Sequence, residues 1–183
     1  MTFSEDELKL LLDALAFSAR KHKDQRRRDV DASPYINHPI SLATILCNEG
    51  HVTDINVICG ALLHDTVEDT DTTAAELEER FGPLISGIVM EVTDDKTLGK
   101  AERKRLQVEH AAHISRQAKL VKLADKISNL RDVADSPPPD WNLERRRGYF
   151  DWAQQVVERL RGTHETLEAI FDNAYAKRPN GDR

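Results

Sequence analysis

Residues 54–69 of the chain read DINVICGALLHDTVED, and this stretch decides the fold. Asp54 is a favourable N-cap residue, and residues 55–63 after it are apolar on almost every side of a helix. A helix that is apolar all round is normally buried inside a domain. The stretch therefore predicts a central buried helix that ends at His64 and Asp65.

The end of this predicted helix carries a histidine and several carboxylates, at His64, Asp65, Glu68 and Asp69. Burying carboxylates without partners is costly or shifts their pKa values, so such a cluster usually needs a cation. Neighbouring residues project about 100° apart around a helix, which allows His64 and Asp65 to bind one ion from two directions. The alternative is a helix end followed by a solvated acidic loop, and this segment alone favours neither.

Helical signals continue on both sides of this segment. Ser4 and Glu7 have the spacing of a capping box, and Gly82 followed by Pro83 indicates a stop and a restart. Together with apolar periodicity, these signals predict an all-α fold, a helical bundle of about eight helices. The predicted helices comprise residues 4–22, 40–48, 54–65, 73–93, 100–115, 119–133, 143–161 and 163–176.

The overall composition is typical of a globular protein. The chain has 183 residues, of which 39% are hydrophobic and 32% are charged, and this balance excludes a disordered chain. Aromatic residues make up only 5%, which favours helices over a β-sandwich. We expect a single domain over residues 1–183, with its core at about 4–170 and a flexible tail at 177–183.

Charge and targeting signals limit the classes of partner. The formal net charge of −6 argues against a general nucleic-acid binder, which needs an excess of positive charge. The N-terminus has no basic segment followed by an apolar one, and no apolar run approaches the length of a membrane span. Cys47 and Cys59 form no CxxC motif, which indicates reduced thiols. We expect a cytoplasmic protein without nucleic-acid or membrane partners, and the sequence does not indicate its oligomeric state.

A second polar signal lies at residues 122–132, which read KLADKISNLRD. Asp125, Asn129 and Asp132 are spaced so that they share one stripe of a helix, while apolar residues occupy much of the remainder. A polar stripe on a core helix often lines a cavity. Its alternative is an ordinary solvent-exposed face.

A third signal lies at residues 34–39, which read PYINHP and place His38 at the start of a predicted helix. A lone histidine in this position is more often a cap or a packed side chain than a metal ligand. The loop before it is strongly basic at residues 26–28, which read RRR. Phosphate binding and a solvated run of charge are both compatible with this loop.

Taken in order, five motifs resemble the His-Asp metal-dependent phosphohydrolase superfamily, and within it the hydrolase domain of the RelA/SpoT enzymes. The resemblance is closest to the small alarmone hydrolases of the metazoan SpoT homologue type, and it extends from about Ser4 to Ile170. The motifs are RRR at 26–28, PYINHP at 34–39, HDTVED at 64–69, EVTDDK at 91–96 and VKLADK at 121–126.

The resemblance implies a role for particular residues. The implied metal is manganese, which suits mixed imidazole and carboxylate ligands. The metal ligands implied are His38, His64, Asp65 and Asp125, and the implied catalytic pair that handles the attacking water is Glu68 and Asp69. The residues implied for the nucleotide are Arg27, packed on the guanine base, Arg28, where the family usually carries a lysine, and Lys100, Asn129, Arg145 and Tyr149.

The implied activity is hydrolysis of the 3′-pyrophosphate of guanosine tetraphosphate (ppGpp), the alarmone of the stringent response, to GDP and pyrophosphate. An alternative keeps this site but acts on another purine nucleotide, for example as an NADPH 2′-phosphatase. A nucleotide-binding sensor without catalysis is a third possibility, but it would lack a ligand or the Glu-Asp pair, and neither is missing. The full-length relatives carry a nucleotidyl synthetase domain after the hydrolase, whereas this chain stops at Arg183, so we expect degradation without synthesis.

Overall fold

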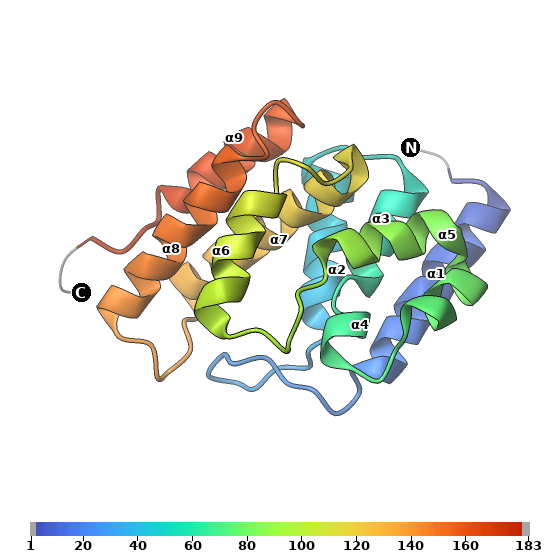
Figure 1. Ribbon diagram of the computed structural model, residues 1–183, viewed down its shortest axis with the longest axis horizontal. Helices are drawn as coiled ribbons and strands as arrows, with labels where there is room; N and C mark the ends of the chain where they lie inside the picture. The colour runs from blue at the N-terminus through green and yellow to red at the C-terminus, as the bar shows by residue number, and fades with distance from the viewer. Residues whose placement is uncertain (1–2, 181–183) are drawn as a thin grey trace.

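The computed structural model describes residues 3–180, and these residues form helices and connecting loops without a strand (Figure 1). The all-α prediction is therefore confirmed. Arg26 and Pro34 form one isolated β-bridge inside the basic loop. The helices are α1 (Glu5–Lys21), α2 (Asn37–Thr44), the π-helical turn η1 (Ile45–Glu49), α3 (Ile55–Leu63), α4 (Thr66–Asp69), α5 (Ala74–Val92), α6 (Lys100–His110), α7 (Arg116–Asp135), α8 (Leu143–Glu158) and α9 (Glu165–Tyr175).

Helix α3 lies at the centre of the fold, as the sequence predicts. Every residue of α3 except Asn56 is buried, and the Asp54 side chain caps its first turn. The helix packs against α1, α2, α5 and α7. Figure 1 shows α1 and α5 grouped with α3 on one side and α6, α8 and α9 on the other.

Helix α7 links the two groups, because it packs against α2, α3 and α5 as well as against α8 and α9. Its apolar side chains, among them Leu123, Ile127 and Leu130, are fully buried. One stripe of α7 nevertheless carries Asp125 and Asn129, as predicted. This stripe runs past the end of α3, so the buried polar residues of two core helices meet.

Several helix boundaries differ from the prediction; for example, α7 begins at Arg116 and not at 119, and α8 ends at Glu158 and not at 161. Helix α6 ends at His110 and not at Ser115, because the Ser115 side chain accepts the Ala118 amide at 3.1 Å and caps α7. The helix predicted at 40–48 begins earlier, at Asn37, and ends as the wider turn η1. Local sequence signals are ambiguous at such positions, because a serine can end one helix or begin the next.

The segment after α3 also differs, because residues 66–69 form the separate one-turn helix α4. The Thr66 hydroxyl donates to the Leu63 carbonyl at 2.7 Å and closes the end of α3. The predicted break at Gly82 is confirmed, since this residue has a φ of 83° between two helical portions of α5. A left-handed φ is available to glycine without steric cost, and Pro83 restarts the helix.

The C-terminal segment contacts the helices that precede it. Lys177 donates to Asp135 at 3.2 Å, and Arg178 donates to Asp151 at 2.7 Å. Residues 181–183 of the expected tail lie outside the described residues. Among residues 3–180, no helix combines the length and apolarity that crossing a membrane requires.

The close packing of α3 on α5 generates a stability prediction. A Cβ atom on Gly60 would lie 2.8 Å from Ile88 Cγ2, whereas a Cβ on Gly87, also in α5, would contact nothing. We expect Gly60→Ala to destabilise the fold by about 1–3 kcal/mol through overpacking. Gly87→Ala, the matched control, should stabilise it by about 0.5–1 kcal/mol through reduced backbone entropy. Chemical denaturation measures both, and equal effects would contradict the packing argument.

Candidate functional site

Three predicted metal ligands converge at the end of the central helix. His38 lies in α2, His64 follows the last residue of α3, and Asp65 begins the turn into α4. Each side chain offers one ligand atom, and these atoms lie within 4.8 Å of one another. His64 Nε2 lies 2.9 Å from Asp65 Oδ2, and His38 Nε2 lies 3.9 Å from the same oxygen. Two imidazoles and a carboxylate therefore face a common point.

The orientation of His64 fits a metal ligand. Its Nδ1 donates to the Ala61 carbonyl oxygen at 2.8 Å, which leaves Nε2 directed at the common point. Nε2 is buried and makes no hydrogen bond to the described residues. Metal-binding histidines typically donate one ring nitrogen to a carbonyl or carboxylate and bind the metal through the other. The residues present thus fit a divalent metal ion.

Asp125, the fourth predicted ligand, enters this group from α7. Its Oδ1 lies 3.3 Å from His38 Nε2 and accepts a hydrogen bond from Asn129 at 2.5 Å. Its Oδ2 accepts from the Lys126 ammonium at 2.8 Å. Burial alone would raise the pKa of Asp125, but Lys126 and His38 hold it well below the usual range. Asp125 is therefore an ionised carboxylate with fixed orientation.

The electrostatics of the group favour a cation at His64. Burial opposes a charge on this ring, yet the Asp65 and Asp125 carboxylates outweigh burial and raise the pKa of His64 to about 9. Burial would raise the pKa of Asp65, but His64, His38 and the hydroxyl of Tyr35 keep it low. Two buried carboxylates thus provide a negative potential at His64 Nε2, which a proton or a metal ion can balance.

Glu68 and Asp69 are adjacent in sequence but face different surroundings. Glu68 accepts the Asp94 backbone amide at 3.0 Å and lies 3.7 Å from an Arg103 nitrogen. Burial raises the pKa of Glu68 to about 6, and the Asp65 carboxylate adds to this rise. A carboxylate with such a pKa is ionised at neutral pH and is also an effective proton acceptor.

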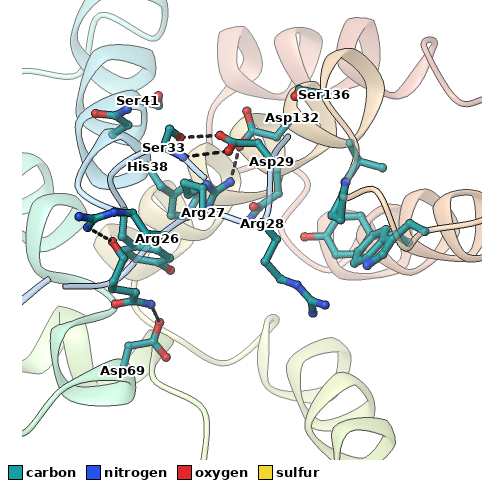
Figure 2. A pocket seen from close by; sticks show the side chains of 18 residues that line it. Arg26, Arg27, Arg28, Asp29, Ser33, His38, Ser41, Asp69, Asp132 and Ser136 are labelled. Atoms are coloured by element: carbon teal, nitrogen blue, oxygen red, sulfur yellow. Dashed lines mark hydrogen bonds and ion pairs between the residues drawn. The ribbon is translucent and has the colours of Figure 1, made fainter. Parts of the chain in front are cut away.

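Asp69, in contrast, is engaged on both oxygens. It accepts a hydrogen bond from the Gln25 side-chain amide at 2.8 Å (Figure 2). It also forms an ion pair with Lys96. Glu68 lines the same cavity as all four predicted metal ligands, whereas Asp69 lines a neighbouring cavity. The two carboxylates are therefore not equivalent in position.

The cavity that Asp69 lines has a volume of about 490 Å³, and we call it the arginine cavity (Figure 2). The basic loop forms one side of it, and the end of α7 and the start of α8 form the other. Arg27 crosses from the loop to pair with Asp132, and its guanidinium lies 5.7 Å from the centre of the Tyr35 ring. The lining residues are Gln25, Arg26, Arg27, Arg28, Asp29, Ser33, Tyr35, Asn37, His38, Ser41, Asp69, Asn129, Asp132, Val133, Ser136, Pro138, Trp141 and Tyr149.

The cavity that Glu68 lines has a volume of about 260 Å³, and we call it the lysine cavity. The four predicted metal ligands, the His-Asp group, also line it. Its other walls come from α6, α7 and α8 and carry Lys100, Arg103, Lys104, Lys122 and Lys126. The two cavities adjoin, because both are lined by Arg27, Tyr35, His38, Asn129 and Tyr149. A mixed polar and aromatic space thus meets a strongly cationic space at the predicted metal ligands.

The residues predicted for the nucleotide are distributed over both cavities. Arg27, Asn129 and Tyr149 line both, Arg28 lines the arginine cavity, and Lys100 lines the lysine cavity. Arg145 lines neither of them. Arg145 and Arg28 both form ion pairs with Asp140. The Arg145 guanidinium lies 4.6 Å from the centre of the Trp141 ring.

The structure adds residues to which sequence reasoning gave no role. Tyr35 donates to Asp65 Oδ2 at 2.5 Å, and the His22 ring packs on Tyr35 with centroids 4.9 Å apart. His22 Nδ1 also lies 2.6 Å from Gln25 Oε1, which orients the Gln25 amide towards Asp69. The separation of only three residues between His22 and Gln25, in the turn after α1, was a local signal for this contact. Nothing local indicated that Lys96 reaches Asp69.

Comparisons with known proteins agree with this site. The family model described as "HD domain" matches residues 14–149. The Danio rerio protein named guanosine-3′,5′-bis(diphosphate) 3′-pyrophosphohydrolase MESH1 is 55% identical, over 92% of this chain and 94% of its own length. The Homo sapiens protein of the same name is 56% identical over equal shares.

Comparison with solved structures indicates the same family. A solved structure described as a metazoan ortholog of SpoT that hydrolyzes ppGpp superposes with a TM-score of 0.91 and 48% sequence identity. The match covers 97% of this chain and 98% of that one. With the family model spanning most of the sequence and with relatives that share more than half of its residues, the chain belongs to the HD-domain family and, within it, groups with the MESH1 relatives of SpoT.

Proposed function

We propose that this chain is a manganese-dependent hydrolase that removes the 3′-pyrophosphate of ppGpp, with GDP and pyrophosphate as products. The observation that carries the proposal is the meeting of the two cavities at the His-Asp group. The arginine cavity suits a guanosine, and the lysine cavity suits a polyphosphate. The names of the Danio rerio and Homo sapiens relatives support the same reaction.

Manganese is proposed from the chemistry of the donors. His38, His64, Asp65 and Asp125 offer nitrogen and oxygen ligands without a thiolate, a set that suits a borderline divalent ion such as manganese. When bound, such an ion supplies Lewis acidity to a phosphoryl oxygen and lowers the pKa of coordinated water. The Tyr35 hydroxyl and the Ala61 carbonyl orient Asp65 and His64 for this purpose.

Glu68 is the residue that we assign to proton transfer. It lines the cavity with the metal ligands, and its pKa of about 6 leaves it ionised at neutral pH. Glu68 accepts a proton from the attacking water, whose oxygen forms a bond to the phosphorus next to the ribose. The bond from this phosphorus to the ribose 3′-oxygen breaks, and the 3′-oxygen takes up a proton. These steps balance as ppGpp and water giving GDP and pyrophosphate.

The nucleoside is placed in the arginine cavity by geometry and charge. Arg27 is held between Asp132 and the Tyr35 ring, so its planar guanidinium is presented in one orientation. A planar cation of this kind packs on a purine base. Trp141 and Tyr149, with ring centroids 5.5 Å apart, supply aromatic surface on the α8 side of the same space.

The positions of Glu68 and Asp69 generate a first kinetic prediction. Glu68→Gln should lower kcat by at least about a hundredfold, because the proton acceptor is lost, while manganese and nucleotide still bind. Asp69→Asn should act mainly on KM, because Asp69 lines the arginine cavity with Gln25 and Lys96 as partners. Steady-state kinetics and elemental analysis measure both effects. Loss of metal in the Glu68 variant would instead make Glu68 a ligand.

Metal binding should be visible in stability as well as in turnover. At a free manganese concentration of about a hundredfold Kd, binding adds about 2.7 kcal/mol, which corresponds to a Tm increase of about 5–10 °C. Chelator treatment should remove both this increase and the activity. His64→Gln should abolish the shift in Tm, whereas His110→Gln, which changes an exposed histidine of α6, should preserve it. A manganese-induced shift that survives in His64→Gln would place the metal elsewhere.

The basic loop offers a matched pair of arginines. The side chain of Arg27 is 17% exposed and reaches both cavities, while that of Arg28 is 67% exposed. Arg27→Met should raise KM for ppGpp at least about tenfold, equivalent to about 1.4 kcal/mol, and Arg28→Met should have a much smaller effect. Manganese content should not change in either variant. Equal KM values for wild type and Arg27→Met would remove this residue from the proposed guanine site.

The choice between ppGpp and NADPH is tested by kinetics on both compounds under identical conditions. We expect the higher kcat/KM with ppGpp, because its diphosphate adds negative charge inside the lysine cavity. A higher kcat/KM with NADPH would replace the proposed substrate while leaving the metal centre in place.

A further inference from the structure

Lys122 is a buried cation that forms no close ion pair among the described residues. It lies on α7, lines the lysine cavity and is only 7% exposed. Within residues 3–180 its ammonium forms no ion pair within 4.0 Å and no hydrogen bond with a side chain. Burial and the neighbouring Lys126 lower the pKa of Lys122 to about 8, although the carboxylates of Asp94, Asp125 and Glu68 oppose this shift. A buried charge without a partner destabilises a fold, so this position is adapted to an anion that arrives from solution.

Lys104 lies in the same cavity on α6. Its ammonium lies 4.5 Å from the centre of the Trp152 ring and 5.4 Å from that of Tyr149. Aromatic faces stabilise a cation without neutralising it. No carboxylate of the described residues pairs with Lys104, and burial, with Lys100 and Lys126 nearby, lowers its pKa to about 8. Two cations of neighbouring helices therefore share one cavity and form no ion pair, although Glu68, Asp94 and Asp125 also line it.

Other buried basic groups around the His-Asp centre already have acidic partners. Lys126 pairs with Asp125, and Arg103 lies 3.7 Å from Glu68. Lys100 also lines the cavity without an ion pair but is exposed, so the unpaired positive charge that is withdrawn from solvent lies on Lys104 and Lys122. All four predicted metal ligands line the same cavity, so one anion with two phosphate groups can reach both the metal ligands and these lysines.

We propose that Lys104 and Lys122 form a subsite for the outer phosphate of a 3′-diphosphate and thereby select diphosphate over monophosphate. This inference rests on the proposed function, which puts the inner phosphate at the His-Asp group. From there the outer phosphate extends between α6 and α7. The smaller volume of this cavity, about 260 Å³ against about 490 Å³, leaves the nucleoside to the arginine cavity.

The first test measures binding without turnover. Manganese-loaded protein is titrated calorimetrically with inorganic pyrophosphate and, in separate experiments, with orthophosphate and with GDP. Lys122→Met and Lys104→Gln should each weaken pyrophosphate binding at least about tenfold and orthophosphate binding by less than about threefold. Arg105→Gln is the matched control, since Arg105 is exposed on α6 and pairs with Glu102 and Glu109, and its affinity should equal that of wild type.

The second test uses two substrates that differ only in the outer phosphate. With ppGpp, kcat/KM of Lys122→Met should fall at least about tenfold, while with guanosine 5′-diphosphate 3′-monophosphate it should change less than about threefold. A purely structural role for Lys122 would reduce both alike. Thermal stability separates these cases further, because removal of an unpartnered buried charge should leave Tm unchanged or raise it.

Each outcome has a definite meaning. Unchanged pyrophosphate affinity in both variants overturns the subsite. Weakened binding of GDP to the same extent as pyrophosphate also overturns it, because the cavity would then take the 5′-diphosphate. Wild-type protein that hydrolyses neither substrate contradicts the proposed function alone, and the calorimetric titrations still decide whether Lys104 and Lys122 bind a diphosphate.

Discussion

The contact between His64 and Asp65 at the end of α3 is the interaction on which the site depends. It places a charged pair at the end of a helix that is otherwise almost entirely buried. Buried charge is tolerated only where opposite charge and hydrogen bonds surround it. Helix α2 supplies His38 and α7 supplies Asp125 with Lys126, so the packing of three core helices is also the assembly of the candidate metal centre.

Much of the fold was predictable because its signals are local. The apolar run of α3, the capping box at Ser4 and the glycine at Gly82 each act within a turn or two of the chain, and each appears in the structure as expected. The cation site at His64 and Asp65 was also predictable, because ionisable residues directly after an apolar helix usually need a cation nearby. The one-turn helix α4 was missed because nothing in its own residues separates it from α3.

The partners of site residues were not predictable in the same way, because they are distant in sequence. Asp69 pairs with Lys96, and Arg27 of the basic loop pairs with Asp132 of α7. Single-sequence patterns place a side chain on a face of a helix, but they do not show which loop covers that face. This is also why Glu68 and Asp69 looked equivalent in the sequence and differ in the structure.

The hairpin of the basic loop has a consequence for the speed of nucleotide capture. The Arg27 amide donates to the Ser33 carbonyl at 2.8 Å, the Tyr35 amide donates to the Gln25 carbonyl at 3.1 Å, and Asp29 accepts from both the amide and the hydroxyl of Ser33. A loop fixed by its own hydrogen bonds loses little further conformational entropy when a ligand arrives. The guanidinium of Arg27 is thus presented as a preformed surface, and association should proceed at a rate set by diffusion and charge, without a slow closing step.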